Sequence, residues 1–186
     1  MAQHKPAFDE AMKNEGGYAN VKGDDGGMTY KGIAYKFWPN WVGWPKIKAW
    51  IAQHGEPKRG HIFTDIEGLD NDVYSFYEAN FWGQINGYNI NSQEVATFLY
   101  DWFIHSGRTV IKKVQKLVEI EPPTGFFGTV TLERVNNVGV PLLDSLYLAR
   151  NKFYVAHCEV EKEDKKFLEA WLHRSDTLYK KLKAIV

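Results

Sequence analysis

The stretch Glu15-Gly16-Gly17-Tyr18, followed by Asp24-Asp25-Gly26-Gly27-Met28-Thr29-Tyr30-Lys31-Gly32-Ile33, is the most informative part of this 186-residue chain. Its glycines and short polar runs favour a small β-hairpin over another helix. We expect the hairpin to fold back over Glu15. One carboxyl group then lies beside a glycine-rich turn that carries a second carboxylate and a hydroxyl, a layout suited to cleaving a glycosidic bond.

The residues before Glu15 predict an amphipathic helix. Pro6 suits the first turn of a helix. Three apolar residues then recur on one helical face: Phe8, Ala11 and Met12. Glu15 falls on the same face, so we expect its carboxyl group to lean on apolar neighbours, which raises the pKa of a carboxyl group and suits a general acid. Gly16 and Gly17 are expected to end the helix and to leave Glu15 at an open edge.

Two residues of the glycine-rich stretch are candidates to assist Glu15. A turn can bring Asp24 and Thr29 into the same pocket, where the carboxylate can orient or deprotonate the attacking water and the hydroxyl can hold it. Each residue also has a structural explanation: glutamate is common at solvated helix ends, aspartate before glycine in turns, and threonine in strands.

Aromatic residues make up 15% of the chain, with 7 tryptophans. Flat rings stack on the apolar faces of sugar rings, so sugar-binding clefts favour them. Tyr18 and Tyr30, which flank the proposed pocket, are the first candidates for substrate binding. The cluster from Phe37 to Trp44 either extends this cleft or fills a core under a long loop, and the sequence leaves both explanations open.

The run from Glu15 to Ile33 resembles the signature of the glycoside hydrolase family 108 muramidases, in which Glu-Gly-Gly-Tyr is followed by Asp-x-Gly-Gly-x-Thr-x-x-Gly-Ile. Every fixed position of that pattern is filled. The resemblance continues through Tyr77, Phe81-Trp82, Ile85-Asn86, Val95 to Asp101 and Ser106-Gly107. It implies a lysozyme-like fold and cleavage of the β-1,4 bond between N-acetylmuramic acid and N-acetylglucosamine in peptidoglycan, with Glu15 as the catalytic acid.

The order of glutamate, aspartate and threonine is also similar to that in phage-type lysozymes, which would assign Asp24 and Thr29 to the attacking water. Asp25 stands where the family often has proline and competes with Asp24 for this role. Whether the reaction inverts or retains the anomeric centre depends on the separation of the carboxyl groups, and inversion is our working choice. A lytic transglycosylase and a non-catalytic module for wall binding or secretion are the alternatives.

Later in the chain, Thr124-Gly125-Phe126-Phe127-Gly128-Thr129-Val130-Thr131-Leu132 is similar to the Gly-x-x-Gly-x-x-Thr-Leu element of a predicted peptidoglycan-binding domain that accompanies these enzymes. The resemblance therefore implies a lysozyme-like catalytic domain over residues 1–91. It implies a helical peptidoglycan-binding domain over residues 92–186, packed against the first.

Helical patterns fill most of the remaining chain. Pro45 to Gly55 predicts one helix, and a capping box of Thr64 and Glu67 predicts another up to about Asn80. Further helices are predicted from Ser92 to Gly107 and over residues 108–118, 129–137, 141–161 and 164–184. The predicted fold class is mainly α (α+β, lysozyme-like): a helical bundle with a small β-hairpin next to the catalytic glutamate.

Composition excludes several other classes. The net charge is zero, which argues against nucleic-acid binding. The single cysteine, Cys158, excludes an internal disulfide, and the six scattered histidines give no reason to expect a metal or cofactor. Asp101 and His105, four residues apart, are interpreted as a helix-stabilising pair.

The chain shows no stretch typical of a signal peptide and no apolar run long enough to cross a membrane. We therefore expect it to be made in the cytoplasm and to reach the cell wall after export or lysis. A holin, as used by phage endolysins, or another export system would then be a partner, and the glycan strands of peptidoglycan the substrate.

Overall fold

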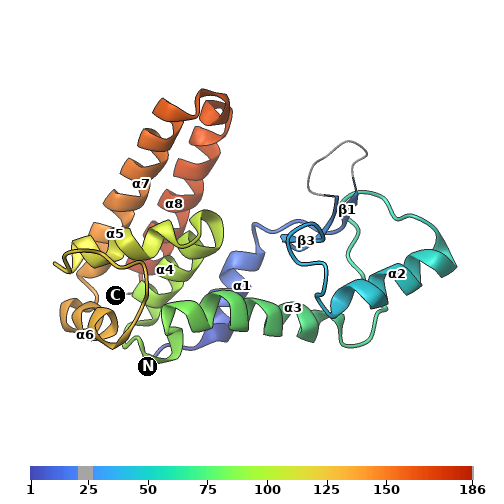
Figure 1. Cartoon of the computed structure of the whole chain (residues 1–186), viewed down its shortest axis with the longest axis horizontal. Helices are drawn as coiled ribbons and strands as arrows, with labels where there is room; N and C mark the ends of the chain where they lie inside the picture. The colour runs from blue at the N-terminus through green and yellow to red at the C-terminus, as the bar shows by residue number, and fades with distance from the viewer. Residues whose placement is uncertain (21–26, 186) are drawn as a thin grey trace. The chain divides into compact units, whose positions relative to one another are not determined.

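The structure, a computed structural model, describes residues 1–20 and 27–185 (Figure 1). The chain forms two compact units. We call Phe8–Asn80 the sheet unit, and Met1–Ala7 together with Phe81–Val186 the helical unit. These bounds differ from the predicted domains 1–91 and 92–186, whose separate functions stay a prediction.

The sheet unit contains a three-stranded antiparallel sheet in the order β1-β2-β3. Its strands are β1 (Ala19–Asn20), β2 (Met28–Tyr30) and β3 (Ile33–Ala34). Tyr30 pairs with Ile33, so Lys31 and Gly32 form a two-residue turn, and both have positive φ angles, 44° and 77°. Two positive φ angles are typical of the type I′ turn, whose twist matches that of the strands it joins. The predicted small β structure is therefore present, as a three-stranded sheet.

The sheet unit also contains α2 (Gly43–His54) and α3 (Leu69–Tyr77), and α1 (His4–Met12) begins in the helical unit and ends in the sheet unit. As predicted, α2 ends before Gly55, whose φ of 83° suits glycine. The predicted capping box of Thr64 and Glu67 is wrong, because α3 begins only after Gly68, with no side-chain cap. Gly68 has a φ of 72° and turns the chain into the helix, and the acidic first turn interacts favourably with the helix dipole.

A π-helical turn (η1, Glu78–Trp82) and two 3₁₀ turns (η2, Gly83–Ile85, and η3, Gly87–Asn89) follow α3. The helical unit then contains α4 (Gln93–Ser106), α5 (Thr109–Leu117), α6 (Thr129–Val138), α7 (Leu142–Val160), a 3₁₀ segment η4 (Lys162–Phe167) and α8 (Leu168–Lys183). These bounds lie within a few residues of the predicted ones, except that α8 starts at Leu168 rather than Asp164. Ser92 caps α4, since its Oγ accepts a hydrogen bond from Val95 N at 3.1 Å.

The predicted pairing of Asp101 with His105 is wrong. Asp101, which is 2% exposed, forms ion pairs with Arg150 on α7 at 2.7 Å and with Arg174 on α8 at 2.6 Å. His105 instead shares a hydrogen bond of 2.8 Å with the Tyr154 hydroxyl. Two guanidinium groups compensate the buried charge of Asp101 far better than one imidazole, and they join α4, α7 and α8.

The fold is mainly α with one small antiparallel sheet, as the sequence predicts for a lysozyme-like protein. Within residues 1–20 and 27–185, no helix combines the length and the apolar character needed to span a bilayer.

Candidate active site

Glu15 lies beyond the end of α1 and not within it. The last α-helical residue is Met12, and the following amides of Lys13, Asn14 and Glu15 bond to carbonyls three residues back, as in the tighter 3₁₀ geometry. The helix thus ends earlier than the predicted stop at Gly16 and Gly17.

Gly17 is required for a different reason than ending a helix. Tyr18 N donates to His61 O at 2.8 Å, and Gly60 N donates to Tyr18 O at 2.7 Å. A Cβ atom at Gly17 would lie 2.5 Å from the carbonyl oxygens of Gly60 and His61. The chain must leave the helix to form this backbone bridge, and only glycine permits the close approach.

The Glu15 carboxyl group lies against the turn between β2 and β3. A Cβ atom built at Gly32 would lie 2.6 Å from Glu15 Oε2 and 2.5 Å from the Tyr77 hydroxyl oxygen. The Tyr77 hydroxyl donates a hydrogen bond of 2.7 Å to Lys31 O. A half-buried carboxyl group and a tyrosine hydroxyl therefore approach the same glycine.

An ion pair also connects this turn to α3, because Lys31 Nζ lies 2.8 Å from Asp70 Oδ1. Tyr77, at the other end of α3, holds the Lys31 carbonyl. The position of the turn beside Glu15 is thus fixed through α3. A two-residue turn between short strands is a signal that sequence analysis can use for Gly32. Tyr77 carries no local signal, and only the family resemblance pointed to it.

The predicted helpers of Glu15 are only partly described. Asp24 and its competitor Asp25 lie outside the described residues. Thr29 is half-buried on the central strand β2, where it pairs with Ala19 on one side and Ala34 on the other. Its assignment to the attacking water stays a prediction.

The two tyrosines predicted to bind substrate are buried, with 1% of Tyr18 and 0% of Tyr30 exposed. Both rings pack against Phe63, at centroid distances of 5.7 and 5.3 Å. The Tyr18 hydroxyl donates to Glu56 Oε1 at 2.6 Å. Burial raises the pKa of Tyr18 well above its ordinary value and that of Tyr30 to about 12, so both are neutral near pH 7. Stacking of sugar on these rings stays a prediction.

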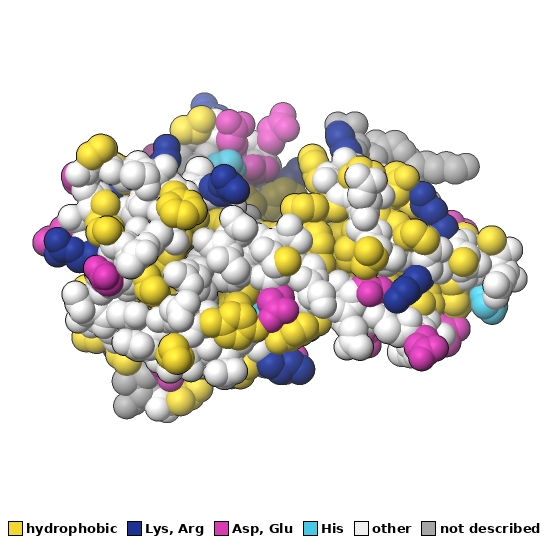
Figure 2. Space-filling model, turned by 60° about the horizontal axis from the view of Figure 1, so that its bottom comes forward, with side chains coloured by type: hydrophobic (Ala, Val, Ile, Leu, Met, Phe, Trp, Pro, Cys, Tyr) yellow, Lys and Arg dark blue, Asp and Glu magenta, His cyan; other side chains and the backbone are white. Residues whose placement is uncertain are grey.

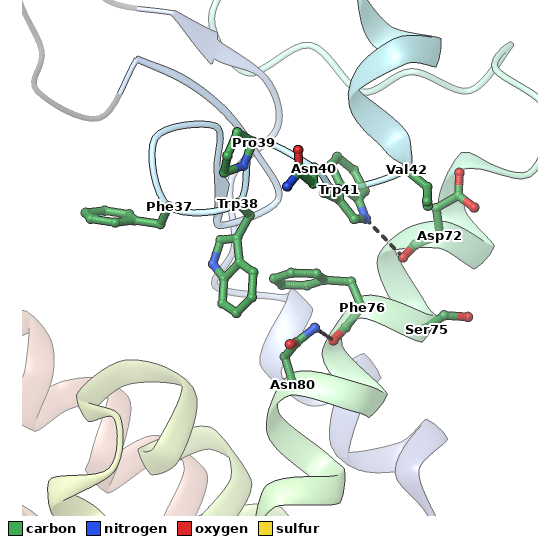
Figure 3. Close-up of a pocket in the computed structure, with 10 residues that line it drawn as sticks. All are labelled: Phe37, Trp38, Pro39, Asn40, Trp41, Val42, Asp72, Ser75, Phe76 and Asn80. Carbon is green, nitrogen blue, oxygen red and sulfur yellow. Dashed lines mark hydrogen bonds between the residues drawn. The ribbon is translucent and has the colours of Figure 1, made fainter.

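The aromatic cluster from Phe37 to Trp44 is divided between the core and the surface, and its role in extending the substrate cleft stays a prediction. Trp41 and Trp44 are core residues, 7% and 1% exposed. Phe37 and Trp38 are 70% and 39% exposed and line a pocket of about 420 Å³ with residues of α3 (Figure 3). The pocket thus combines the two exposed rings with two buried ones, Trp41 and Phe76.

Across the part of the chain that the structure describes, no three or more His, Cys, Asp or Glu side chains gather as they would around a metal ion. Acid–base chemistry by side chains is what the residues around Glu15 can offer.

A family model described as Glycosyl hydrolase 108 matches residues 8–107, more than half of the chain. Among proteins of curated function, none matches this chain significantly. The solved structure of Brucella abortus SagA is similar with a TM-score of 0.66 and 22% sequence identity, over 97% of this chain and 94% of SagA. At this identity the similarity shows a shared fold.

Proposed function

Because the chain belongs to the glycosyl hydrolase 108 family, we propose that it is an N-acetylmuramidase. It cleaves the β-1,4 bond between N-acetylmuramic acid and N-acetylglucosamine in the glycan strands of peptidoglycan. The family supports glycoside hydrolysis, and the bond and the catalytic residue are our own proposals.

Glu15 is the proposed general acid. The observation that carries this role is the half-buried Glu15 carboxyl group at the Lys31–Gly32 turn, beside the Tyr77 hydroxyl. A general acid must reach the glycosidic oxygen, and the partial exposure of Glu15 leaves its carboxyl group accessible to a substrate. Glu15 protonates the leaving oxygen, which takes the electron pair of the broken bond, while the sugar carbon acquires oxocarbenium character.

Water completes the reaction in this proposal. Asp24, or its neighbour Asp25, removes a proton from the water that attacks the sugar carbon, and the Thr29 hydroxyl orients that water. Inversion requires roughly 6.5 to 9.5 Å between the two carboxyl groups, and retention about 5 Å. We retain inversion as the proposed outcome.

Residues 92–186 are proposed to bind the glycan strand, and this proposal rests on their similarity to the predicted peptidoglycan-binding element. The wall is then the site of action, reached through an export system or through lysis.

Digestion of purified peptidoglycan with mass analysis of the fragments tests the catalytic proposal. The unsubstituted protein should release reducing muramic acid ends, and Glu15→Gln should lower the rate at least about 100-fold, because the amide cannot donate an acidic proton. Glu10→Gln is the matched control, since Glu10 lies on α1, pairs with Lys13 at 2.7 Å and has no proposed catalytic role. Circular dichroism checks that both variants fold.

Three results would contradict the proposal in different ways. An active Glu15→Gln variant would remove Glu15 from the mechanism. Fragments lighter by one water would indicate a lytic transglycosylase. Binding to peptidoglycan without any release of fragments would indicate a non-catalytic module.

A further inference from the structure

Two large aromatic side chains of the sheet unit remain exposed on a segment that is otherwise well anchored. Phe37 is 70% and Trp38 39% exposed, yet the amides of both donate to Ala34 O, at 3.2 and 2.9 Å. Trp44 Nε1 donates to Trp38 O at 2.8 Å. The backbone around the exposed rings is therefore fixed by specific hydrogen bonds.

These rings form one wall of a concave surface. The Trp38 ring packs edge to face on Phe76 of α3, with centroids 4.9 Å apart, and Figure 3 shows Phe37 and Trp38 on the side of the pocket opposite Ser75. On the face that Figure 2 shows, hydrophobic side chains lie among charged ones at the surface. Isolated exposed apolar residues are common, but several that share a pocket indicate a ligand.

The pocket has few polar side chains, and two of them have a partner within the protein. Asn80 Nδ2 donates to Phe76 O at 2.8 Å, which sets the orientation of its amide, and Asn40 and Ser75 also line the pocket. Asp72 is neutralised by Lys46 at 2.6 Å. A mostly apolar pocket with amide and hydroxyl groups at its rim, and with its carboxylate already paired, fits an uncharged ligand that has an apolar face.

The elements α3 and β3 contribute both to the pocket and to the surroundings of Glu15. Phe76 lines the pocket, and its neighbour Tyr77, in ring contact at 5.4 Å, contacts the glycine beside Glu15. The Ala34 carbonyl that anchors Phe37 and Trp38 belongs to β3, the strand that follows the Gly32 turn. The helix α3 and the strand β3 therefore position both the pocket and the Gly32 turn beside Glu15.

We propose that this pocket binds one N-acetylated sugar residue of the glycan strand, at a position that does not take part in bond cleavage. The assignment rests on the proposed function for the identity of the polymer. The apolar face of the pyranose ring stacks on Trp38, the acetamido methyl group contacts Phe37 or Phe76, and Asn80 and Ser75 bond to the ring substituents. The volume of about 420 Å³ lies within the range of roughly 300 to 1,000 Å³ usual for small-ligand pockets.

The test combines binding and turnover in the full chain. A soluble tetrasaccharide of alternating N-acetylglucosamine and N-acetylmuramic acid is titrated into Glu15→Gln protein by calorimetry, with and without Trp38→Ala. We expect Trp38→Ala to weaken binding about tenfold, the effect of losing one good stacking contact. In the protein with Glu15 intact, Trp38→Ala should raise KM on peptidoglycan by a similar factor and leave kcat within about twofold, because the contact is made equally in ground and transition states.

Phe37→Ala is the second variant, since its ring is largely exposed and its loss costs little stability. Tyr88→Ala removes a ring of similar exposure to Trp38, 43% exposed, outside both the pocket and residues 92–186, and is the matched control. Unchanged binding and KM in folded Trp38→Ala and Phe37→Ala proteins would overturn the inference while leaving the hydrolase intact. If the tetrasaccharide binds in a way that depends on Trp38, but the protein with Glu15 intact shows no turnover, the pocket is supported and the hydrolase is refuted. A change of molecular mass on substitution, by light scattering, would instead assign the rings to contact between copies and overturn the inference.

Discussion

The absence of a side chain at Gly32 lets the Glu15 carboxyl group and the Tyr77 hydroxyl approach the same point of the chain. Lys31 adopts a φ of 44° to complete the turn, which costs a non-glycine residue conformational energy that the bonds to Tyr77 and Asp70 offset. At the residue scale, the candidate site thus depends on the missing Cβ atom of Gly32 as much as on the Glu15 carboxyl group.

Gly32→Ala tests this dependence. The new methyl group would lie 2.5 to 2.6 Å from two oxygen atoms and must displace Glu15 or Tyr77. Since a shift of about 1 Å in a catalytic group can cost about 100-fold in rate, we expect a loss of that size in peptidoglycan hydrolysis. Gly55→Ala is the matched control, because Gly55 has a φ of 83° and no atoms within 4 Å of an added Cβ. Comparable losses in both variants would show that backbone strain alone is responsible.

At the scale of single elements, two similar sequence signals behave differently. Ser92 accepts a hydrogen bond from Val95 N and caps α4. Thr64 is also a capping residue type, with Glu67 three residues later as in a capping box, but the helix that follows begins after Gly68. A capping side chain needs the chain to enter the helix directly after it, and Gly68, with its positive φ, delays that entry.

This difference predicts the stability of two alanine variants. Ser92→Ala should lower the free energy of unfolding by about 1 kcal/mol, through loss of the cap. Thr64→Ala, at an exposed position, should change it by less than about 0.5 kcal/mol. Urea unfolding followed by circular dichroism measures both values. A change as small in Ser92→Ala as that expected for Thr64→Ala would mean that Ser92 Oγ contributes no net stabilisation to α4.

At the scale of the whole molecule, a buried charge cluster joins three helices of the helical unit. Asp101 pairs with Arg150 and Arg174, and Arg150 Nε donates to the Tyr154 hydroxyl, which is bonded to His105. Burial, and then the nearby Arg174 and Arg150, lower the pKa of His105 from 6.5 to about 4. His105 is therefore neutral in the folded protein at pH 5, where it is protonated in the unfolded chain.

The sign of the resulting pH dependence follows from this difference. Between pH 6.5 and 4 the unfolded state binds a proton at His105 that the folded state does not, so stability falls as the pH falls through this window. The loss attributable to His105 is at most about 3 kcal/mol. We expect the melting temperature of His105→Asn, which keeps a polar partner for Tyr154, to fall less steeply from pH 6.5 to 4. His54→Asn, at an exposed histidine, should follow the unsubstituted protein. Parallel slopes for all three would refute a neutral, buried His105.

Local patterns were sufficient to predict most helices and the small sheet. Helices from α4 to α7 begin and end near their predicted residues, because capping residues, glycines and prolines act on their immediate neighbours. The end of α1 was misplaced for a non-local reason: Gly17 meets Gly60 and His61, far along the chain, and that bridge draws Glu15 out of the helix. Likewise, no spacing in α4 indicates that the partners of Asp101 are arginines on α7 and α8.

By itself the sequence determined the family, the mainly α fold with its small sheet, and Glu15 as the candidate acid, since these follow from a contiguous motif and from periodic patterns. Tertiary structure alone decided that Tyr77 meets Glu15 at Gly32, and that the rings of Phe37 and Trp38 are exposed at a pocket while those of Trp41 and Trp44 are buried. The physical reason is that burial and contact depend on which distant segments pack together, and a local pattern of residues contains no record of that packing.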